Sequence, residues 1–306
     1  MTALNKKLFV GALVAGIACA VSFLPFARNP SAPKAFDSAL LNPSHRDDVT
    51  EIVIMQEMNF VQINDPPTLT LKKVVPDGQK EAWWTASDGL TTVRADKKLI
   101  ENVLKNIISV RKMYIISDKF ETGKKTTPSH QALIIRNDDT SYTKIDFFDT
   151  NTLTNRIMFG VESANSLFET ADNFSQFLQT NVRYWAKPEL VQTVDEPVLF
   201  VWKETGCGAV TVAQYSPDFA SVAHDVMALR HGAVVHTQKS LQGQTAVLTI
   251  GAGEYRERIF LCPQDDGSYR CEYAFVGTPS PSDALHFAFE ISGWTYERLQ
   301  KIFAER

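Results

Sequence analysis

One pattern, an amphipathic helix followed by a strand, occurs twice in this chain. Residues Val103–Arg111 align without gaps with Val222–Arg230, and the match continues from Tyr114–Ile116 to Ala233–Val235. In both runs apolar residues recur every three or four positions, as they do on one face of a helix. Such a repeat favours one supersecondary unit used twice. The alternative is that any helix followed by a strand would give a similar match.

Short segments rich in β-branched residues surround both runs. In Thr50–Gln56, for example, apolar and polar residues alternate, as expected of a half-buried strand. Farther along, Tyr142–Phe147 resembles Tyr255–Phe260 in the second set of strands. Strands outnumber helices, so the sheets should be largely antiparallel with helices packed on a face. We predict an α+β fold of two related halves, with one or two helices in each.

The ends of the predicted helices carry recognisable signals. Asp96 is placed to cap the first helix, and Ser216 followed by Pro217 is placed to begin the second. Gly232 is expected to end that second helix in a left-handed conformation. Ser292 can cap a last helix, on which Trp294 should be buried. A further short helix is expected around Asn173–Thr180.

The segment Leu8–Ala27 is uncharged and mostly apolar, and it follows Lys6 and Lys7. A run of roughly 20 apolar residues can cross a bilayer as a helix. It is also longer than the apolar core of a cleaved signal peptide, roughly 7–15 residues. We therefore expect a retained signal anchor, with a single transmembrane helix and the bulk of the chain exported.

This segment has two alternative fates. Cleavage after Ala27 fits poorly, because Pro25 stands where a small residue such as alanine is preferred. Lipid modification of Cys19 has only a partial small-residue box before it, and the sequence after it stays apolar. The expected organisation is an anchor over 1–28, a linker over 29–45, and two α+β halves over 46–190 and 191–306.

The cysteines beyond the anchor are Cys207, Cys262 and Cys271. Asp266-Gly267 is a strong hairpin signal. With those two residues as the turn, Cys262 and Cys271 fall at a non-hydrogen-bonded pair, where side chains approach most closely. We predict a disulfide there; the alternative is two buried free thiols. Cys207 is expected in a glycine-rich hairpin turn.

No catalytic, cofactor-binding or metal-binding constellation stands out. His224 and His231 are two helical turns apart, roughly 10 Å, which is too far to share a metal ion. The formal net charge of −4 and the absence of a basic stripe argue against nucleic acid as a partner. Lys97-Lys98 is one of several isolated lysine pairs that read as solvated surface. We expect no cofactor and no enzymatic activity.

The run Ala82-Trp83-Trp84-Thr85, followed after a gap by Ala95-Asp96 and a helix ending at Arg111, resembles an uncharacterised bacterial family. That family is the domain-of-unknown-function family found beside gliding-motility-type (GldG-like) ABC transporters. The stretch Asn155–Phe159, followed by Phe174–Leu178 and Trp185, is similar to its later region. The resemblance implies an auxiliary component of a transport complex in the bacterial inner membrane, with its domain in the periplasm. It supplies no catalytic residues.

The function expected from these features is a membrane-anchored extracytoplasmic accessory protein that binds envelope partners, with ABC transporter subunits as candidates. One alternative is a tethered envelope hydrolase or glycan-binding protein that uses Trp83, Trp84 or Trp185. Two close carboxylates or a His–Ser pair in a pocket would support a hydrolase. Another alternative is a solute receptor, which needs a cleft between the halves.

Overall fold

The structure is a computed structural model of the chain. It describes residues 34–57, 67–75, 82–117, 128–136, 141–162, 166–174, 176–235, 243–277 and 285–304. Among these residues, no helix is long and apolar enough to cross a membrane. The expected anchor, Leu8–Ala27, lies outside the described residues and stays a prediction.

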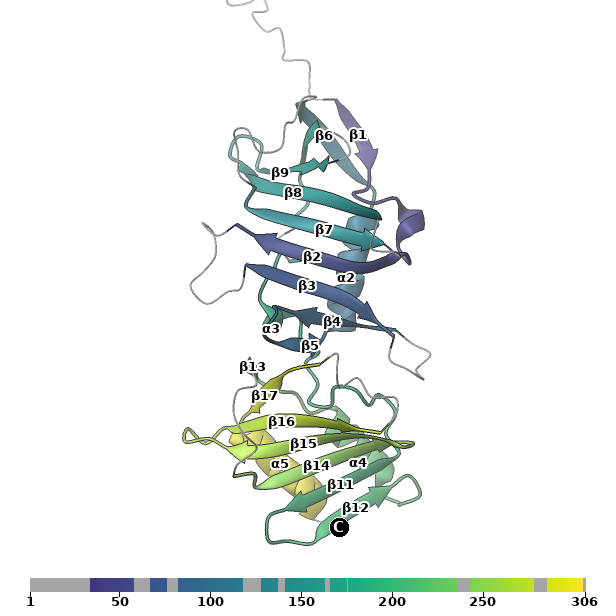
Figure 1. Ribbon diagram of the computed structural model, residues 1–306, viewed down its shortest axis with the longest axis vertical. Helices are drawn as coiled ribbons and strands as arrows, with labels where there is room; N and C mark the ends of the chain where they lie inside the picture. The colour runs from purple at the N-terminus through teal and green to yellow at the C-terminus, as the bar shows by residue number, and fades with distance from the viewer. Residues whose placement is uncertain are drawn as a thin grey trace, which may run out of the picture.

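The protein has a sheet-rich α+β fold in which two antiparallel sheets lie one above the other along the long axis (Figure 1). The first sheet has ten strands in the order β1-β6-β10-β9-β8-β7-β2-β3-β4-β5. Its strands are β1 (Ala35–Ser38), β2 (Val49–Gln56), β3 (Thr68–Val74), β4 (Trp83–Ser87), β5 (Thr92–Arg94), β6 (Arg111–Ser117), β7 (His130–Arg136), β8 (Ser141–Asn151), β9 (Arg156–Val161) and β10 (Ser166–Thr170).

The second sheet has seven strands in the order β12-β11-β14-β15-β16-β17-β13. Its strands are β11 (Leu199–Glu204), β12 (Ala209–Ala213), β13 (Ala233–Val235), β14 (Ala246–Ala252), β15 (Tyr255–Pro263), β16 (Tyr269–Val276) and β17 (Ala288–Ile291). The helices are α2 (Lys97–Ile108), the short α3 (Val182–Trp185), α4 (Phe219–Met227) and α5 (Gly293–Ala304), with a 3-10 turn, η1, at Pro43–His45.

The two sheets share one strand order. The stretch β3-β2-β7-β8-β9-β10-β6 of the first sheet corresponds, strand for strand, to the whole second sheet, and all of these pairs are antiparallel. Helix α2 precedes β6 as α4 precedes β13. The first sheet adds the β4–β5 hairpin at one end and β1 at the other. The repeat seen in the sequence therefore coincides with a repeated topology.

Burial follows the repeat along the helices. Val103 and Ile107 of α2 are buried at the positions equivalent to Val222 and Val226 of α4. In the strands the proposed match is one residue out of phase, because Tyr142 is exposed whereas Tyr255 is buried. Residue-by-residue similarity could not detect this shift, since a slip of one position exchanges the two faces of a strand.

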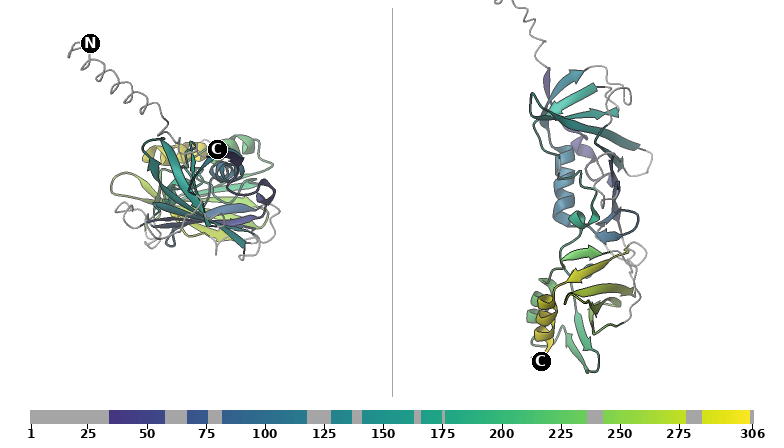
Figure 2. Two further views of the ribbon diagram at one scale, coloured as in Figure 1. Left: turned by 90° about the horizontal axis from the view of Figure 1, so that it is seen from above. Right: turned by 90° about the vertical axis from the view of Figure 1, so that its left-hand side faces the viewer.

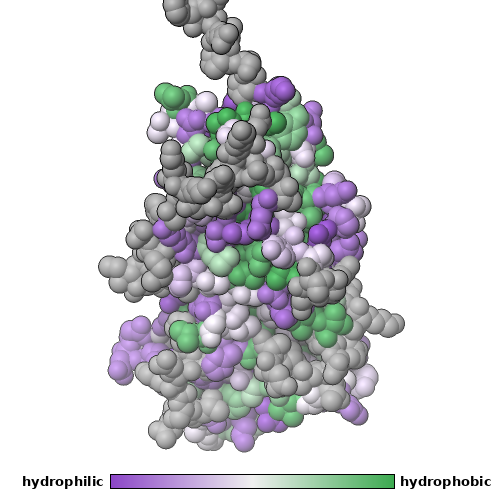
Figure 3. Space-filling view, turned by 45° about the horizontal axis from the view of Figure 1, so that its top comes forward, coloured by the Kyte–Doolittle hydropathy of each residue, from purple (hydrophilic) through white to green (hydrophobic). Residues whose placement is uncertain are grey.

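Helices α2, α4 and α5 pack against the same side of the two sheets (Figure 2). Each buries one apolar face; the buried residues of α5 include Leu299, Ile302 and Phe303. Hydrophobic and hydrophilic residues are interspersed on the face shown in Figure 3.

Three predictions about helices need correction. The described residues around Asn173–Thr180 form no helix; the short helix begins later, at Val182. Helix α4 starts at Phe219 and ends at Met227, and Gly232 instead donates its N–H to the Glu290 carbonyl at 2.7 Å. Trp294 is 67% exposed on α5. Asp96, by contrast, caps α2 as predicted, accepting a hydrogen bond from the Lys98 N–H at 2.7 Å.

The expected linker over 29–45 is also corrected, because its described part belongs to the fold. Strand β1 pairs with β6, so that Phe36 lies opposite Met113. Leu40 and Leu41, just after β1, are buried. Two prolines and small residues before β1 gave the segment its linker character, but the apolar residues that follow are part of the core.

The structure does not form the disulfide predicted between Cys262 and Cys271, which are both free and buried. The hairpin loop holds three residues, 265–267, with Gly267 in a left-handed conformation (φ 82°) and the Gln264 N–H donating to the Ser268 carbonyl at 2.9 Å. This register sets Cys271 opposite Leu261 and Cys262 opposite Arg270. The two thiols therefore belong to opposite faces of the sheet. Cys207 lies exposed in the β11–β12 turn, as predicted.

Candidate functional site

The candidate site lies where the two sheets meet. Backbone hydrogen bonds join them directly, since Thr92 of β5 and His286 exchange N–H···O bonds of 2.7 and 2.8 Å. The connecting segment, residues 186–198, also bonds to both sides. The Lys187 N–H donates to the Arg94 carbonyl at 2.8 Å, and the Leu190 N–H donates to the Leu229 carbonyl at 2.7 Å.

A fully buried carboxylate holds the connecting segment against the second sheet. Glu257 of β15 accepts from the backbone N–H groups of Gln192 and Thr193, both at 2.7 Å, and from Val194 at 3.2 Å. It also accepts from the Thr193 hydroxyl at 2.6 Å. Burial raises the pKa of Glu257, and these hydrogen bonds act in the opposite direction. The carboxylate fixes the backbone just before Asp195.

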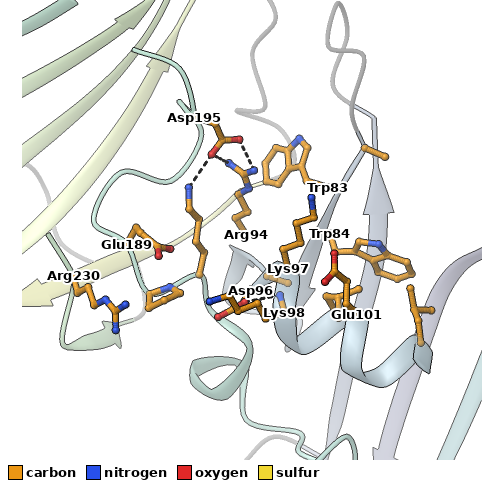
Figure 4. Close-up of a pocket in the computed structure, with 16 residues that line it drawn as sticks. Trp83, Trp84, Arg94, Asp96, Lys97, Lys98, Glu101, Glu189, Asp195 and Arg230 are labelled. Atoms are coloured by element: carbon orange, nitrogen blue, oxygen red, sulfur yellow. Dashed lines mark hydrogen bonds and ion pairs between the residues drawn. The ribbon is translucent and has the colours of Figure 1, made fainter. Parts of the chain in front are cut away.

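Asp195 in turn binds two cations, one from each side of the junction. Arg94 of β5 donates to its carboxylate in bidentate fashion, at 3.1 and 2.7 Å, and Lys187 donates at 3.1 Å (Figure 4). The Arg94 guanidinium lies 5.0 Å from the centre of the Trp83 ring. Burial pushes the pKa of Asp195 upward, but the hydrogen bonds and charges of Arg94 and Lys187 together bring it below its ordinary value.

His231 completes the packing of the connecting segment from the side of α4. Its ring stacks on Phe289 with the centroids 3.6 Å apart, and Nε2 lies 2.8 Å from the Lys187 carbonyl. Because a carbonyl can only accept, Nε2 carries the proton. Nδ1 is buried with no hydrogen-bond partner. Burial lowers the pKa of His231, so the neutral ring is favoured.

Beside this junction is an open groove with a volume of about 850 Å³. Five elements build it: β4, β5, the first turns of α2, the connecting segment, and the turn after α4. Figure 4 shows Trp84 at one end, Lys97 and Lys98 in the middle, and Arg230 at the other end. The lining residues are Ala82, Trp83, Trp84, Arg94, Ala95, Asp96, Lys97, Lys98, Ile100, Glu101, Leu104, Lys187, Pro188, Glu189, Asp195 and Arg230.

The side chains that line the groove include no serine, cysteine or histidine. Of its carboxylates, Asp96 caps α2 and Asp195 is bound by Arg94 and Lys187. Asp96 and Asp195 are therefore committed to structure, which leaves Glu101 and Glu189 as the other carboxylates of the lining. The lining offers an aromatic surface and charges, which suit binding more than nucleophilic chemistry.

A His–Ser contact does occur elsewhere, between Ser129 Oγ and His130 Nδ1 at 3.3 Å. The Ser129 hydroxyl, however, donates its hydrogen to the Phe147 carbonyl at 3.2 Å. It cannot donate the same hydrogen to the imidazole, and neither residue lines the groove. No group of three metal-ligating side chains occurs within the described part of the chain.

The three tryptophans proposed as a glycan-binding surface differ in their burial. Trp185 is fully buried, and its Nε1–H donates to the Gln179 carbonyl at 2.8 Å. Trp83 is buried under Arg94, whereas Trp84 is half-buried and lines the groove. The sequence pointed to Trp84 as an aromatic candidate, but it gave no signal for Lys187, Glu189 or Arg230, which only the fold brings into the same groove.

No family model, curated protein or solved structure matches this chain. The resemblance to the family found beside GldG-like transporters stays a prediction. Of the residues on which it rests, Ala82-Trp83-Trp84 and Ala95-Asp96 line the groove.

Proposed function

We propose that this chain is a membrane-anchored extracytoplasmic accessory protein that binds another envelope protein through the groove at the junction of its two sheets. The segment Leu8–Ala27 would hold it in the bacterial inner membrane. An ABC-type transport complex is the candidate assembly, on the strength of the resemblance carried by Ala82–Thr85 and Ala95-Asp96.

The observation that carries this proposal is the make-up of the groove. It is open, it joins a half-buried indole to exposed cations, and its lining contains no serine, cysteine or histidine. Tryptophan and arginine are the residues most enriched at the energetic centres of protein interfaces. The hydrogen bonds of Arg94 and Lys187 to Asp195 fix the walls of the groove before a partner binds.

Glycan binding is the second candidate, because Trp84 presents part of its ring to the groove. A sugar would stack on the indole, whereas a peptide segment would run along the groove. A photoreactive group at residue 84 distinguishes the two ligands, because it would form an adduct with a glycan in one case and with a protein in the other.

The test is site-specific photocrosslinking of the full-length chain in its native membranes. A photoreactive phenylalanine derivative replaces Trp84, and in a matched control it replaces Leu153, which is 94% exposed on the β8–β9 turn. We expect a discrete protein adduct from residue 84 and none of that size from residue 153. Absence of a protein adduct at residue 84, or the same adducts from both positions, would contradict the proposed function.

A further inference from the structure

We infer that the segment bound in the groove is an extended acidic peptide whose carboxylates are spaced apart. This inference rests on the proposed function, and it adds the chemistry of the partner. The unpaired cations of the groove, the helix end that two of them occupy, and the differences between the two halves support it.

Three cations of the groove have no carboxylate partner among the described residues. Lys97, Lys98 and Arg230 line the groove and are exposed, and none of them takes part in an ion pair. The remaining cations, Arg94 and Lys187, are both bound to Asp195. The free positive charge of the groove therefore points to solvent, where an anionic partner can reach it.

Lys97 and Lys98 also stand at an unfavourable place for their own helix. They occupy the first turn of α2, which contains no acidic residue. The amino end of a helix carries a partial positive charge, so each lysine there costs a few tenths of a kcal/mol at an exposed position. A carboxylate bound beside them would be attracted by both lysines and by the helix end.

The second half of the chain serves as an internal reference for what the fold requires. The helix alignment sets Lys97-Lys98 against Ser216-Pro217, and the β4–β5 hairpin that carries Trp84 has no equivalent in the second sheet. The shared topology thus forms without these residues. Lys97, Lys98 and Trp84 are additions to the first half, and all three line the same groove.

The two arginines at equivalent positions, Arg111 and Arg230, also differ between the halves. Arg111 is buried at the start of β6, with its guanidinium 4.8 Å from the centre of the Phe174 ring and its Nη1 3.3 Å from Asp172. Arg230, its counterpart, is exposed and lines the groove. The first arginine stabilises its own half, whereas the second is available to a ligand.

The anions of the groove restrict the partner further. Glu101 and Glu189 line it between and beside the cations, so a continuous polyanion would meet repulsion along its length. A peptide can place a carboxylate at Lys97 and Lys98, another at Arg230, and an apolar side chain at Trp84. Figure 4 shows these groups along one line of the groove, as an extended segment would need.

The experiment uses the full-length chain with the photoreactive group at residue 84, in native membranes. One version also carries K97E, K98E and R230E; a second carries K97R, K98R and R230K. A third carries K105E, K112E and K203E, which are exposed lysines outside the groove lining and give the same net charge. We expect the K97E, K98E and R230E version, the groove reversal, to lower the yield of the protein adduct about tenfold or more. The other two versions should give the same yield as the parent. Mass spectrometry of the crosslinked segment should find more Asp and Glu than Lys and Arg.

The possible results separate this inference from the proposed function. A protein adduct that survives the groove reversal, or a crosslinked segment without an acidic excess, would overturn the acidic peptide and leave a protein-binding groove. Equal loss in the groove reversal and in the K105E, K112E and K203E control would also overturn it, since net charge alone would then explain the effect. A glycan adduct, or none in the parent chain, would overturn both.

Discussion

Arg94 and Asp195 join the two halves of the molecule through a bidentate ion pair with N–O distances of 2.7 and 3.1 Å. Arg94 belongs to the last strand before α2, and Asp195 belongs to the segment that leads to the second sheet. Lys187 adds a third contact at 3.1 Å. The pair fixes one wall of the groove relative to the other.

Asp195→Asn should loosen this junction, because it removes the charge that both cations share. We expect a loss of about 1 kcal/mol in the free energy of unfolding, since Asp195 is more than half exposed. The measurement is urea denaturation of the full chain in mild detergent. With its lowered pKa, Asp195 should stabilise the protein above about pH 4, and this contribution should fade as the pH drops through that lowered value. Asp37→Asn, an exposed change outside the junction, is the control and should cost little.

Glu257→Gln should be more costly, by about 3 kcal/mol. Every group around the Glu257 carboxylate is a donor, so the amide N–H₂ of glutamine would face backbone N–H groups in either orientation. Thr193→Ser keeps the hydroxyl that lies 2.6 Å from Glu257, and it should change stability little. A Glu257→Gln protein as stable as the parent in denaturant titration would contradict this assignment of the carboxylate.

His231 should make the protein less stable in mild acid. Burial lowers its pKa in the folded state, whereas the unfolded chain titrates near 6.5. The unfolded state therefore binds more protons below that pH, so stability is complete above about pH 6.5 and falls as the pH drops toward the lowered pKa. Two groups act against this lowering: the Lys187 backbone carbonyl, which accepts from the ring, and the charge of Glu189.

The measurement compares urea midpoints at about pH 7.5 and about pH 5.5. His231→Phe keeps the stacking on Phe289 but cannot titrate, so its midpoint should fall less between the two values. Burial also lowers the pKa of His130, which therefore adds a similar dependence, so the double variant with His130→Phe should lose still less stability between the two pH values. An unchanged slope in His231→Phe would show that the ring is already accessible to protons.

The thiols should differ sharply in accessibility. On spheroplasts with an intact inner membrane, a membrane-impermeant maleimide should label Cys207, which is exposed and, on this account, extracytoplasmic. Cys262 and Cys271 are buried, and burial raises both of their pKa values, so they should react only after denaturation. Labelling of both Cys262 and Cys271 in denaturant without a reductant would support free thiols. Labelling that requires a reductant would instead support the disulfide predicted from sequence. Cys207→Ser is the control for the surface signal.

Much of the fold was predictable from sequence because helix faces and strand alternation are local patterns. Asp96 as the cap of α2 is such a case, and so is the buried face that contains Val103 and Ile107. The hairpin before Cys271 was misjudged by one residue. Asp266-Gly267 suits more than one turn, and three loop residues with Gly267 left-handed shift the register. Trp294 shows another limit, since an apolar residue in the first turn of a helix need not face the core.

The groove could not be predicted from the sequence, for a different reason. Its lining comes from four places in the sequence, and Arg230 lines the same groove as Trp84 and Lys98 only because the connecting segment brings the two sheets together. Lys97-Lys98 read as ordinary surface, because nothing local distinguishes a lysine beside a groove from one beside bulk water. Glu257 gave no signal either, although it holds the connecting segment against the second sheet.

Co-purification of the full-length, tagged chain from gently solubilised native membranes tests the central claim most directly. The proteins recovered with the parent chain are identified by mass spectrometry and compared with those recovered by Trp84→Ala, after both are shown to melt at similar temperatures. We predict a stoichiometric envelope partner, with ABC transporter subunits as the expected class, and its loss in Trp84→Ala. Recovery of the chain alone in several mild detergents, or equal recovery of the partner by both proteins, would contradict binding through this groove.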